Sequence, residues 1–386
     1  LWDPATGAVK ELSVFDIINN RLCFRLTFGA SQTFLVILHN DLPDSYISAT
    51  NLVLEKTEAN FITGYIKNGD LAKLTLKTGG KQKDIVQLVP KNPPPLILPE
   101  VMNFKIENDN TLCLAKWKML VSNEFSNDNY AALDYDDDHW LPVTIGAWEM
   151  QLPEEPDDIH YPQTLWYRIP FQIEELPNRV KLLIDGFSGS SFRLFINGTE
   201  VKDTGQRSQL DAEIREINIH SYVHPGRNLI AVQLVVQRRT DGILDLIKIT
   251  GDFALKLNDD GYSIVLPKKE VNIGDWCQQG YPYFSGTGTY STELTIPADF
   301  CKGKLFLDIE CGEDVLELQI NDSGPIIVPW HPYQIDITDL VRPGKNTFRF
   351  SITNTLINTL EAVPKSSGLL KPPVITNYQL LKIKID

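Results

Sequence analysis

Aromatic residues gather in a loop-like stretch, GDWCQQGYPYFSG, which contains Trp276, Tyr281, Tyr283 and Phe284. Flat aromatic rings can stack on the C–H faces of sugars, while nearby polar groups fix the hydroxyls. The stretch is therefore a candidate carbohydrate platform. The same rings could instead cover one end of a β-sandwich core, and we favour this second interpretation.

A second aromatic set, Trp330, His331 and Tyr333, lies between prolines in the segment PWHPY. These side chains either contact a sugar or form a packed plug between domains, and we favour the plug.

An acidic run, DYDDDHW, supplies Asp134, Asp136, Asp137 and Asp138. Calcium takes several oxygen ligands, often from aspartate carboxylates, so a structural calcium site is one interpretation. The spacing of an EF-hand is missing, however, and a solvated acidic loop explains the run equally well. No other cofactor is expected.

Catalytic residues cannot be nominated from the sequence. Glycoside hydrolysis needs two carboxyl groups at a fixed separation in a cleft, and 50 Asp and Glu residues guarantee accidental pairs. No GxSxG, HExxH, P-loop or GxGxxG motif occurs. Whether the chain is itself an enzyme is left open.

The overall charge restricts the partners. A formal net charge of −14 opposes binding to nucleic acid and suits neutral or cationic ligands. No apolar run reaches the roughly 18 residues of a membrane span.

The five cysteines are scattered and lack CxxC spacing, which favours reduced thiols and slightly favours a cytoplasmic location, although Cys301 and Cys311 could pair. The chain opens as if in the middle of a domain, so we expect a fragment whose signal peptide would be missing.

Short runs rich in β-branched and aromatic residues recur between turn signals, which predicts an all-β fold. Three consecutive prolines in Lys91–Pro99 favour a stiff connector, and NDDGY and PKK interrupt the pattern near residues 258–269. We therefore expect a small β-rich domain at residues 1–92, followed by domains at residues 93–265 and 266–386.

An internal repeat is the most informative feature of the sequence. Four blocks recur in one order at nearly constant offset, which indicates two copies of one domain-sized unit. The first copy contains WYRIPFQI, VKLLIDGF, FRLFING and INIHSYVHPGRNLIAVQL, and the second contains TYSTELTI, KLFLDIECG, LELQIND and IDITDLVRPGKNTFRFSI.

The repeated turns suggest how each copy folds. ING and IND are typical of tight hairpin turns, because Asn and Gly tolerate positive φ, while PGRN and PGKN are typical of Pro-Gly turns. An all-β unit of roughly 120 residues is most simply a sandwich, so we expect tandem jelly rolls.

These blocks resemble the galactose-binding-like jelly roll of glycoside hydrolase family 2 and its relatives. The resemblance rests on Trp166–Arg168, Ile184–Gly186, Phe192–Gly198 and Pro225–Val232, and DYDDDHWLPVTI is similar to the acidic opening segment of such modules.

The second copy resembles the carboxyl-terminal end of α-L-rhamnosidase-like hydrolases of family 106. YFSGTGTY, VPWHPYQIDIT, LVRPGKN, ITNTLINTL and SSGLL follow in the order found there, and WDPATGAVKEL is similar to the β-segment that follows the catalytic barrel. The resemblance implies an upstream (β/α)₈ barrel that holds the catalytic carboxylates, yet no segment here alternates strands and helices in that way.

The sequence therefore predicts a non-catalytic segment of a large glycoside hydrolase. It would support the catalytic domain of the same protein and could bind an oligo- or polysaccharide. The alternatives are a glycosidase complete in this chain, acting through an Asp/Glu pair, and an adhesion or scaffold protein.

Overall fold

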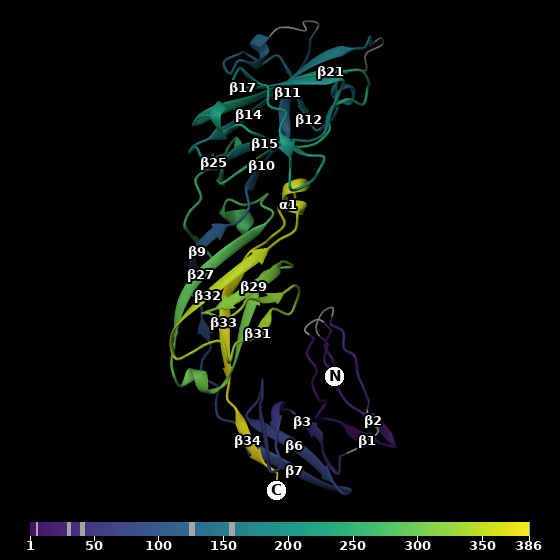
Figure 1. The fold of residues 1–386 in the computed structure, drawn as a ribbon, viewed down its shortest axis with the longest axis vertical. Helices are drawn as coiled ribbons and strands as arrows, with labels where there is room; N and C mark the ends of the chain where they lie inside the picture. The colour runs from purple at the N-terminus through teal and green to yellow at the C-terminus, as the bar shows by residue number, and fades with distance from the viewer. Residues whose placement is uncertain (5–6, 29–31, 39–42, 123–127, 154–158, 386) are drawn as a thin grey trace. The chain divides into compact units, whose positions relative to one another are not determined.

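The structure, a computed structural model, describes residues 1–4, 7–28, 32–38, 43–122, 128–153 and 159–385. Its regular elements are nearly all β-strands, so the all-β fold class is confirmed (Figure 1). Two compact units divide the chain, and each is discontinuous in sequence. Unit 1 comprises Leu1–Met102, Tyr290–Ile352 and Leu369–Asp386, and unit 2 comprises Asn103–Thr289 and Thr353–Gly368.

Unit 2 contains a two-sheet sandwich that we call the first module. Its sheets have the strand orders β12-β11-β14-β21-β17-β18 and β10-β23-β15-β20-β19. The bounds are β10 (Asn110–Leu114), β11 (Lys116–Ser122), β12 (Leu141–Thr144), β14 (Gln163–Ile173), β15 (Val180–Ile184), β17 (Ser191–Ile196), β18 (Thr199–Val201), β19 (Gln206–Arg207), β20 (Arg215–Asn218), β21 (Gly226–Val236) and β23 (Ile247–Gly251).

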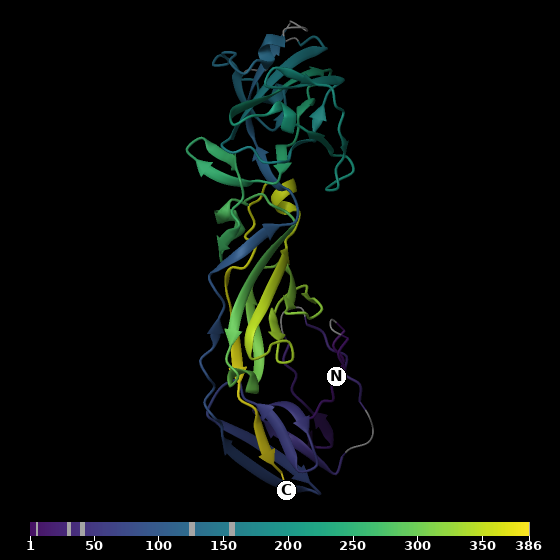
Figure 2. The same ribbon diagram turned by 60° about the vertical axis from the view of Figure 1, so that its left-hand side comes forward.

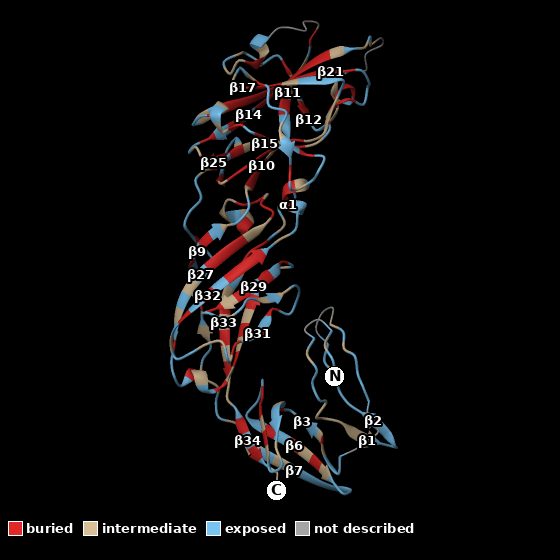
Figure 3. Cartoon of the chain, in the orientation of Figure 1, coloured by how far each residue is buried: buried red, intermediate tan, exposed pale blue. Residues whose placement is uncertain are grey.

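Alternation along β14 explains how one strand serves two apolar layers. Leu165, Tyr167 and Ile169 belong to the core of the sandwich, whereas Trp166 belongs to a separate cluster with Trp140. Successive side chains of a strand point to opposite faces, so a strand buried on both faces becomes a nearly continuous apolar run. Figure 3 shows β14 and β21 largely in the colour of buried residues.

The second module has the strand orders β9-β27-β32-β29-β30 and β8-β33-β28-β31. These strands are β8 (Leu96–Ile97), β9 (Val101–Ile106), β27 (Thr287–Ile296), β28 (Lys304–Glu310), β29 (Val315–Ile320), β30 (Ile326–Val328), β31 (Gln334–Asp336), β32 (Gly344–Thr353) and β33 (Lys371–Tyr378). The same plan occurs in the first module as β11-β14-β21-β17-β18 and β10-β23-β15-β20. Both copies of the sequence repeat therefore fold into one sandwich plan.

Residues 1–92 are also β-rich. Strands β3 (Ser45–Thr50), β6 (Leu71–Thr78) and β7 (Lys81–Leu88) form one sheet, and β4 (Val53–Thr57) and β5 (Phe61–Tyr65) pair with the last strand, β34 (Leu381–Lys384). Figure 2 shows this last strand, in yellow, beside the blue and purple strands of residues 45–88. The pairing of β34 with β5 brings the end of the chain to strands near its beginning.

The remaining elements are short. Strands β1 (Asp16–Ile18) and β2 (Arg21–Cys23) form a hairpin, β24 (Ala254–Asn258) and β25 (Gly261–Val265) form another, and β26 (Glu270–Asn272) is a three-residue strand. The small strands β13 (Gly146–Ala147), β16 (Phe187–Ser188) and β22 (Gly242–Ile243) pair together. Helical segments are α1 (Ile357–Leu360) and the 3₁₀ turns Asp128–Ala131, Glu149–Gln151, His220–Tyr222, Trp276–Gln279 and Phe300–Lys302. Among the described residues, no helix has the length and apolar character needed to cross a bilayer.

Strands β8 and β9 precede the first module in sequence but pair with strands of the second. Val374 of β33 lies opposite Ile97 of β8. The chain therefore begins the second module, builds the first, and then returns to complete the second. The domain boundaries expected at 92/93 and 265/266 remain predictions.

In the first module, two asparagines connect the ING turn to the PGRN turn through hydrogen bonds. Asn197 donates to the carbonyl of Tyr222 and to Oδ1 of Asn228, and its own Oδ1 accepts from the amide of Leu229. Asn228 is fully buried and donates to the carbonyls of His224 and Gly226.

The second module repeats this network. Asn321 donates to the carbonyl of Leu340 and to Oδ1 of Asn346, and it accepts from Thr347 N–H. Asn346 is fully buried and donates to the carbonyls of Arg342 and Gly344. We call each arrangement the asparagine pair of its module.

The backbone at these turns fits the expected residue types in part. Asn197 and Gly198 both have positive φ, and Ile196 pairs with Thr199, which confirms a two-residue hairpin at ING. At IND only Asn321 has positive φ among the described residues, and pairing resumes at Leu318 with Ile326. The Ser323 amide donates to the Ile320 carbonyl, and Ser323 Oγ accepts from the Ile320 amide, so a tight turn forms at IND as expected. A longer loop then follows before β30 pairs with β29.

We predict that Asn346→Ala lowers the free energy of unfolding by about 2–3 kcal/mol, because it leaves several buried backbone groups without hydrogen-bond partners. Denaturant unfolding measures the loss. Asn272→Ala, at an exposed position, is the control and changes stability by less than about 0.5 kcal/mol. Equal small effects from both substitutions would contradict a structural role for the asparagine pair.

Candidate functional site

A pocket of about 530 Å³ opens in unit 1, at the end of strand β28. Four short segments line it: the last residues of β28, the turn that follows this strand, the loop before β31 and the residue before β33. The lining residues are Asp308, Ile309, Glu310, Gly312, Glu313, His331, Pro332, Tyr333, Gln334 and Leu370. The strand plan of the second module therefore brings together segments that lie about 60 residues apart.

Carboxylates dominate the polar lining of this pocket. Asp308 accepts a hydrogen bond from Gln334 Nε2 at 2.6 Å, and Glu310 pairs with Lys371 at 2.8 Å. Glu313 lies in the turn after β28. Since the partner of Asp308 is a neutral amide, that contact leaves its negative charge uncompensated.

The loop before β31 is anchored by Tyr333. This side chain is 3% exposed, its O–H donates to the Asp314 carbonyl at 2.5 Å, and its ring packs edge-on against His331 with 4.5 Å between centroids. Burial raises the pKa of Tyr333 well above its usual range. The tyrosine thus fixes the wall of the pocket, while His331 is exposed.

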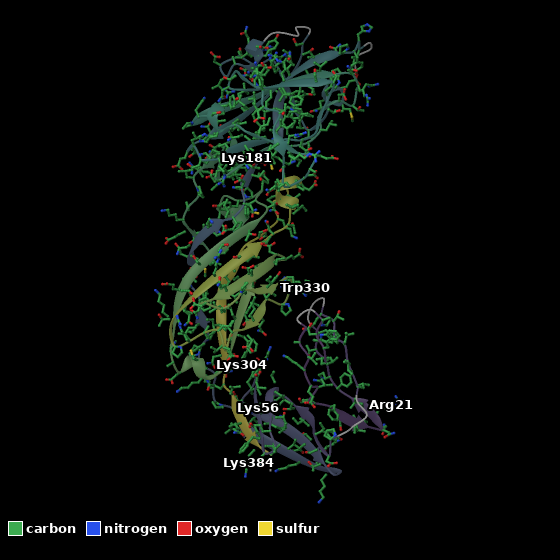
Figure 4. The ribbon with its side chains drawn as sticks, in the orientation of Figure 1. Arg21, Lys56, Lys181, Lys304, Trp330 and Lys384 are labelled. Atoms are coloured by element: carbon green, nitrogen blue, oxygen red, sulfur yellow. The ribbon has the colours of Figure 1, made fainter. Side chains whose placement is uncertain are left out.

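Trp330 adjoins the pocket in sequence and is 49% exposed. Figure 4 marks it in the loop that joins β30 to β31. Of the three aromatic side chains expected in this segment, Trp330 and His331 reach solvent and Tyr333 does not. An exposed indole beside a pocket can take the apolar face of a ligand.

The first aromatic set is placed differently. Trp276, Tyr281 and Phe284 are buried in unit 2, and Tyr283 is half-buried with its ring against Tyr262. The three buried rings offer no open face for stacking. Gly288 of β27 and Gly368 pack so closely against the Trp276 ring that a Cβ added at either glycine would lie 2.4 Å or 2.5 Å from a ring atom.

Within the acidic run, Asp137 is the counter-ion of a buried cation. Arg168, fully buried on β14, donates to Asp137 Oδ2 at 2.6 Å, and Lys118 donates to Oδ1 at 2.7 Å. The guanidinium also lies over the rings of Tyr135 and Trp140. Burial acts to raise the pKa of Asp137, but the hydrogen bonds from Lys118 and Arg168 outweigh it and lower the pKa.

The other candidate calcium ligands do not surround a common point. Asp138 is 95% exposed in its side chain, and Asp136 accepts a hydrogen bond from the Asp138 amide. Among the described residues, no group of three or more His, Cys, Asp or Glu side chains is placed to hold a metal ion. The acidic run is better explained as a segment that covers Arg168 and neutralises its charge.

One ionic cluster was not anticipated from the sequence. Lys248, buried on β23, lies 3.3 Å from Asp245 and 3.9 Å from Asp185. Burial and the neighbouring Asp245 raise the pKa of Asp185. A lysine within the apolar run IKI was the available signal, because a charge there requires a partner.

The cysteines supply no activated thiol at the pocket. Burial raises the pKa of Cys311 to about 12, which keeps the thiol protonated and unreactive. Cys301 and Cys311 both carry free thiols, so they do not pair with each other.

Comparison with known proteins gave no matching family model and no matching curated protein. Several solved glycosidases are similar over part of their length. A family 2 glycosyl hydrolase from Bacteroides cellulosilyticus matches at a TM-score of 0.30 and 13% identity, covering 64% of this chain and 32% of its own. The exo-chitosanase of Amycolatopsis orientalis matches at 0.31 and 13%, covering 71% and 29%.

The β-glucuronidase of Bifidobacterium dentium matches at a TM-score of 0.28 and 12% identity, covering 64% of this chain and 42% of its own. This chain thus spans less than half the length of each of the three proteins.

We predict that Asp137→Asn lowers stability by about 3 kcal/mol at neutral pH, because buried Arg168 loses its counter-ion. The folded-state pKa of Asp137 is depressed, so its stabilisation is present above the unfolded-state value near 3.8 and is lost as the pH falls through the folded-state pKa. The stabilities of wild type and variant should therefore begin to converge as the pH falls below about 3.8, and should meet only below the folded-state pKa. A gap that stayed constant at all pH values would contradict the assignment.

Proposed function

We propose that this chain is a non-catalytic segment of a large glycoside hydrolase, and that the pocket beside Trp330 binds carbohydrate. The observation that carries the proposal is a half-exposed indole, Trp330, next in sequence to His331 of a pocket that is also lined by Asp308, Glu310 and Glu313 from β28 and the turn after it. Carboxylates accept hydrogen bonds from hydroxyl groups, and an indole takes the C–H face of a sugar ring.

The proposal that the larger protein is a glycoside hydrolase rests on the sequence resemblance. The blocks similar to family 2 jelly rolls and to the end of family 106 α-L-rhamnosidase-like enzymes lie on the repeated strands and their turns. The two modules would support a catalytic domain in the same protein, as they do in the families that the sequence resembles.

The proposed support of a catalytic domain rests on exposed apolar side chains near the start of the chain. Phe28, Ile37 and Leu38 are 57%, 62% and 66% exposed. Exposed apolar side chains that cluster in sequence favour a contact with another folded surface. This part of the chain would therefore pack against the catalytic domain.

The alternative of a glycosidase complete in this chain meets an obstacle at Asp185 and Asp245. Retaining enzymes separate their carboxyl groups by about 5–5.5 Å and inverting enzymes by about 6.5–9.5 Å. Asp185 and Asp245 both lie against buried Lys248, at 3.9 Å and 3.3 Å, so they act as its counter-ions. The non-catalytic proposal predicts no turnover of aryl glycosides, and turnover that is lost when one Asp or Glu is replaced would overturn it.

We predict that Trp330→Ala weakens binding to glycans about tenfold or more, since loss of an anchoring indole commonly costs at least 1.4 kcal/mol. A glycan array identifies the ligand and calorimetry measures the affinity. Trp2→Ala is the matched control, because Trp2 is 40% exposed and lies outside the pocket. No binding to any glycan, or equal losses in both variants, would refute the sugar site.

A further inference from the structure

Two asparagines in this chain are followed directly by glycine, at Asn68-Gly69 and Asn197-Gly198. This dipeptide favours deamidation, because glycine has no side chain to hinder attack by its own amide nitrogen on the asparagine side chain. The nitrogen forms a bond to Cγ, and the side-chain amide leaves as ammonia with the proton that the nitrogen gives up. Water then opens the cyclic imide at either carbonyl, which yields aspartate or isoaspartate. Since water is the only other reactant, the two sites can be compared within one protein.

Asn68 meets the requirements of this reaction. It lies in an exposed bend between β5 and β6, and Gly69 is exposed with a φ of +98°. A Cβ added at Gly69 would have no heavy atom within 4 Å outside its neighbours in the chain, so the bend leaves space around the reacting atoms. Within the described part of the chain, no hydrogen bond holds the Asn68 side chain or the Gly69 amide. The side chain can therefore rotate until Cγ reaches the amide nitrogen.

Asn197 is followed by the same residue but has the opposite surroundings. Its Nδ2 donates to the Tyr222 carbonyl at 3.0 Å and to Asn228 Oδ1 at 2.8 Å. Its Oδ1 accepts from the Leu229 amide at 2.9 Å. Ring closure requires the side chain to leave all three contacts. An ionised aspartate has no side-chain donor, so the product could not restore the first two.

We propose that Asn68 is a site of spontaneous deamidation in the folded protein, and that the asparagine pair of the first module protects Asn197 from the same reaction. Each hydrogen bond that must break before the ring closes raises the barrier, so Asn197 reacts at least about tenfold more slowly than Asn68. The modification adds a negative charge to the bend between β5 and β6 and does not depend on the proposed sugar site.

Peptide mass spectrometry of the whole chain, incubated at mildly alkaline pH, tests both statements. In the folded protein, aspartate and isoaspartate should accumulate at Asn68 at least about tenfold faster than at Asn197. In concentrated urea, which removes the protecting contacts, the two sites should react at similar rates because Asn197 accelerates. Asn68→Gln should remove the product at this position, because its ring would need one more atom, and should leave the rate at Asn197 unchanged.

Asn228→Ala tests the protecting contact itself. It removes one acceptor of the Asn197 side chain and should speed deamidation of Asn197 at least about threefold in the folded protein. Asn346→Ala, the corresponding change in the second module, is the matched control and should leave that rate unchanged. Thermal melting confirms that each variant is folded, and the urea comparison remains decisive if one is not.

The other outcomes contradict one statement each. A folded protein that forms no product at Asn68 would refute the assignment of the site. Equal rates at Asn68 and Asn197 in the folded protein would refute the protection. An Asn197 that stays slow in urea would show that the neighbouring sequence sets its rate, and equal effects of Asn228→Ala and Asn346→Ala would show that the contact with Asn228 does not. Either result overturns the protective role of the asparagine pair.

Discussion

The asparagine pair is the interaction on which each module depends. A buried amide side chain can both donate and accept, so one residue can bind two turns that are far apart in sequence. Asn228 and Asn346 are fully buried and bind the Pro-Gly turns, and Asn197 and Asn321 connect them to the preceding turns. Because a buried polar group without a partner is costly, these contacts favour one register between the strands that leave the turns.

This constraint explains why the repeat was visible in the sequence. Asn must be kept where its side chain satisfies backbone groups, and Gly where φ is positive, as at Gly226 and Gly344. The apolar strands between these positions can vary, because any well-packed set of side chains maintains the sandwich. The all-β class and the two copies were therefore predictable, whereas the network between the turns was not.

Other parts of the fold left too little signal in the sequence to be predicted. Strand β8 has two residues, and its place beside β33 depends on partners from a distant part of the sequence. The turn at IND resembles ING in residue types, but strand pairing begins directly at Ile196 and Thr199 beside ING and only at Leu318 and Ile326 beside IND. Sequence periodicity reports which residues share a face and does not report which distant strand pairs with them.

The candidate site was likewise predictable from the sequence only in part. Both aromatic segments were recognised from residue type, yet residue type cannot separate a buried ring such as Trp276 from a half-exposed one such as Trp330. The carboxylates of the pocket were indistinguishable from other acidic residues until β28 and the loop before β31 brought them together. The pairing of Asp137 with Arg168 likewise depends on contacts between distant segments.

The most direct measurement of the central claim is a spectrum of the indole N–H groups of the seven tryptophans during titration with the bound glycan. The signal of Trp330, assigned with a Trp330→Phe variant, should shift with the ligand concentration while that of buried Trp276 remains fixed. A shift confined to another tryptophan, or no shift when binding is detected by calorimetry, would contradict a sugar site at this pocket.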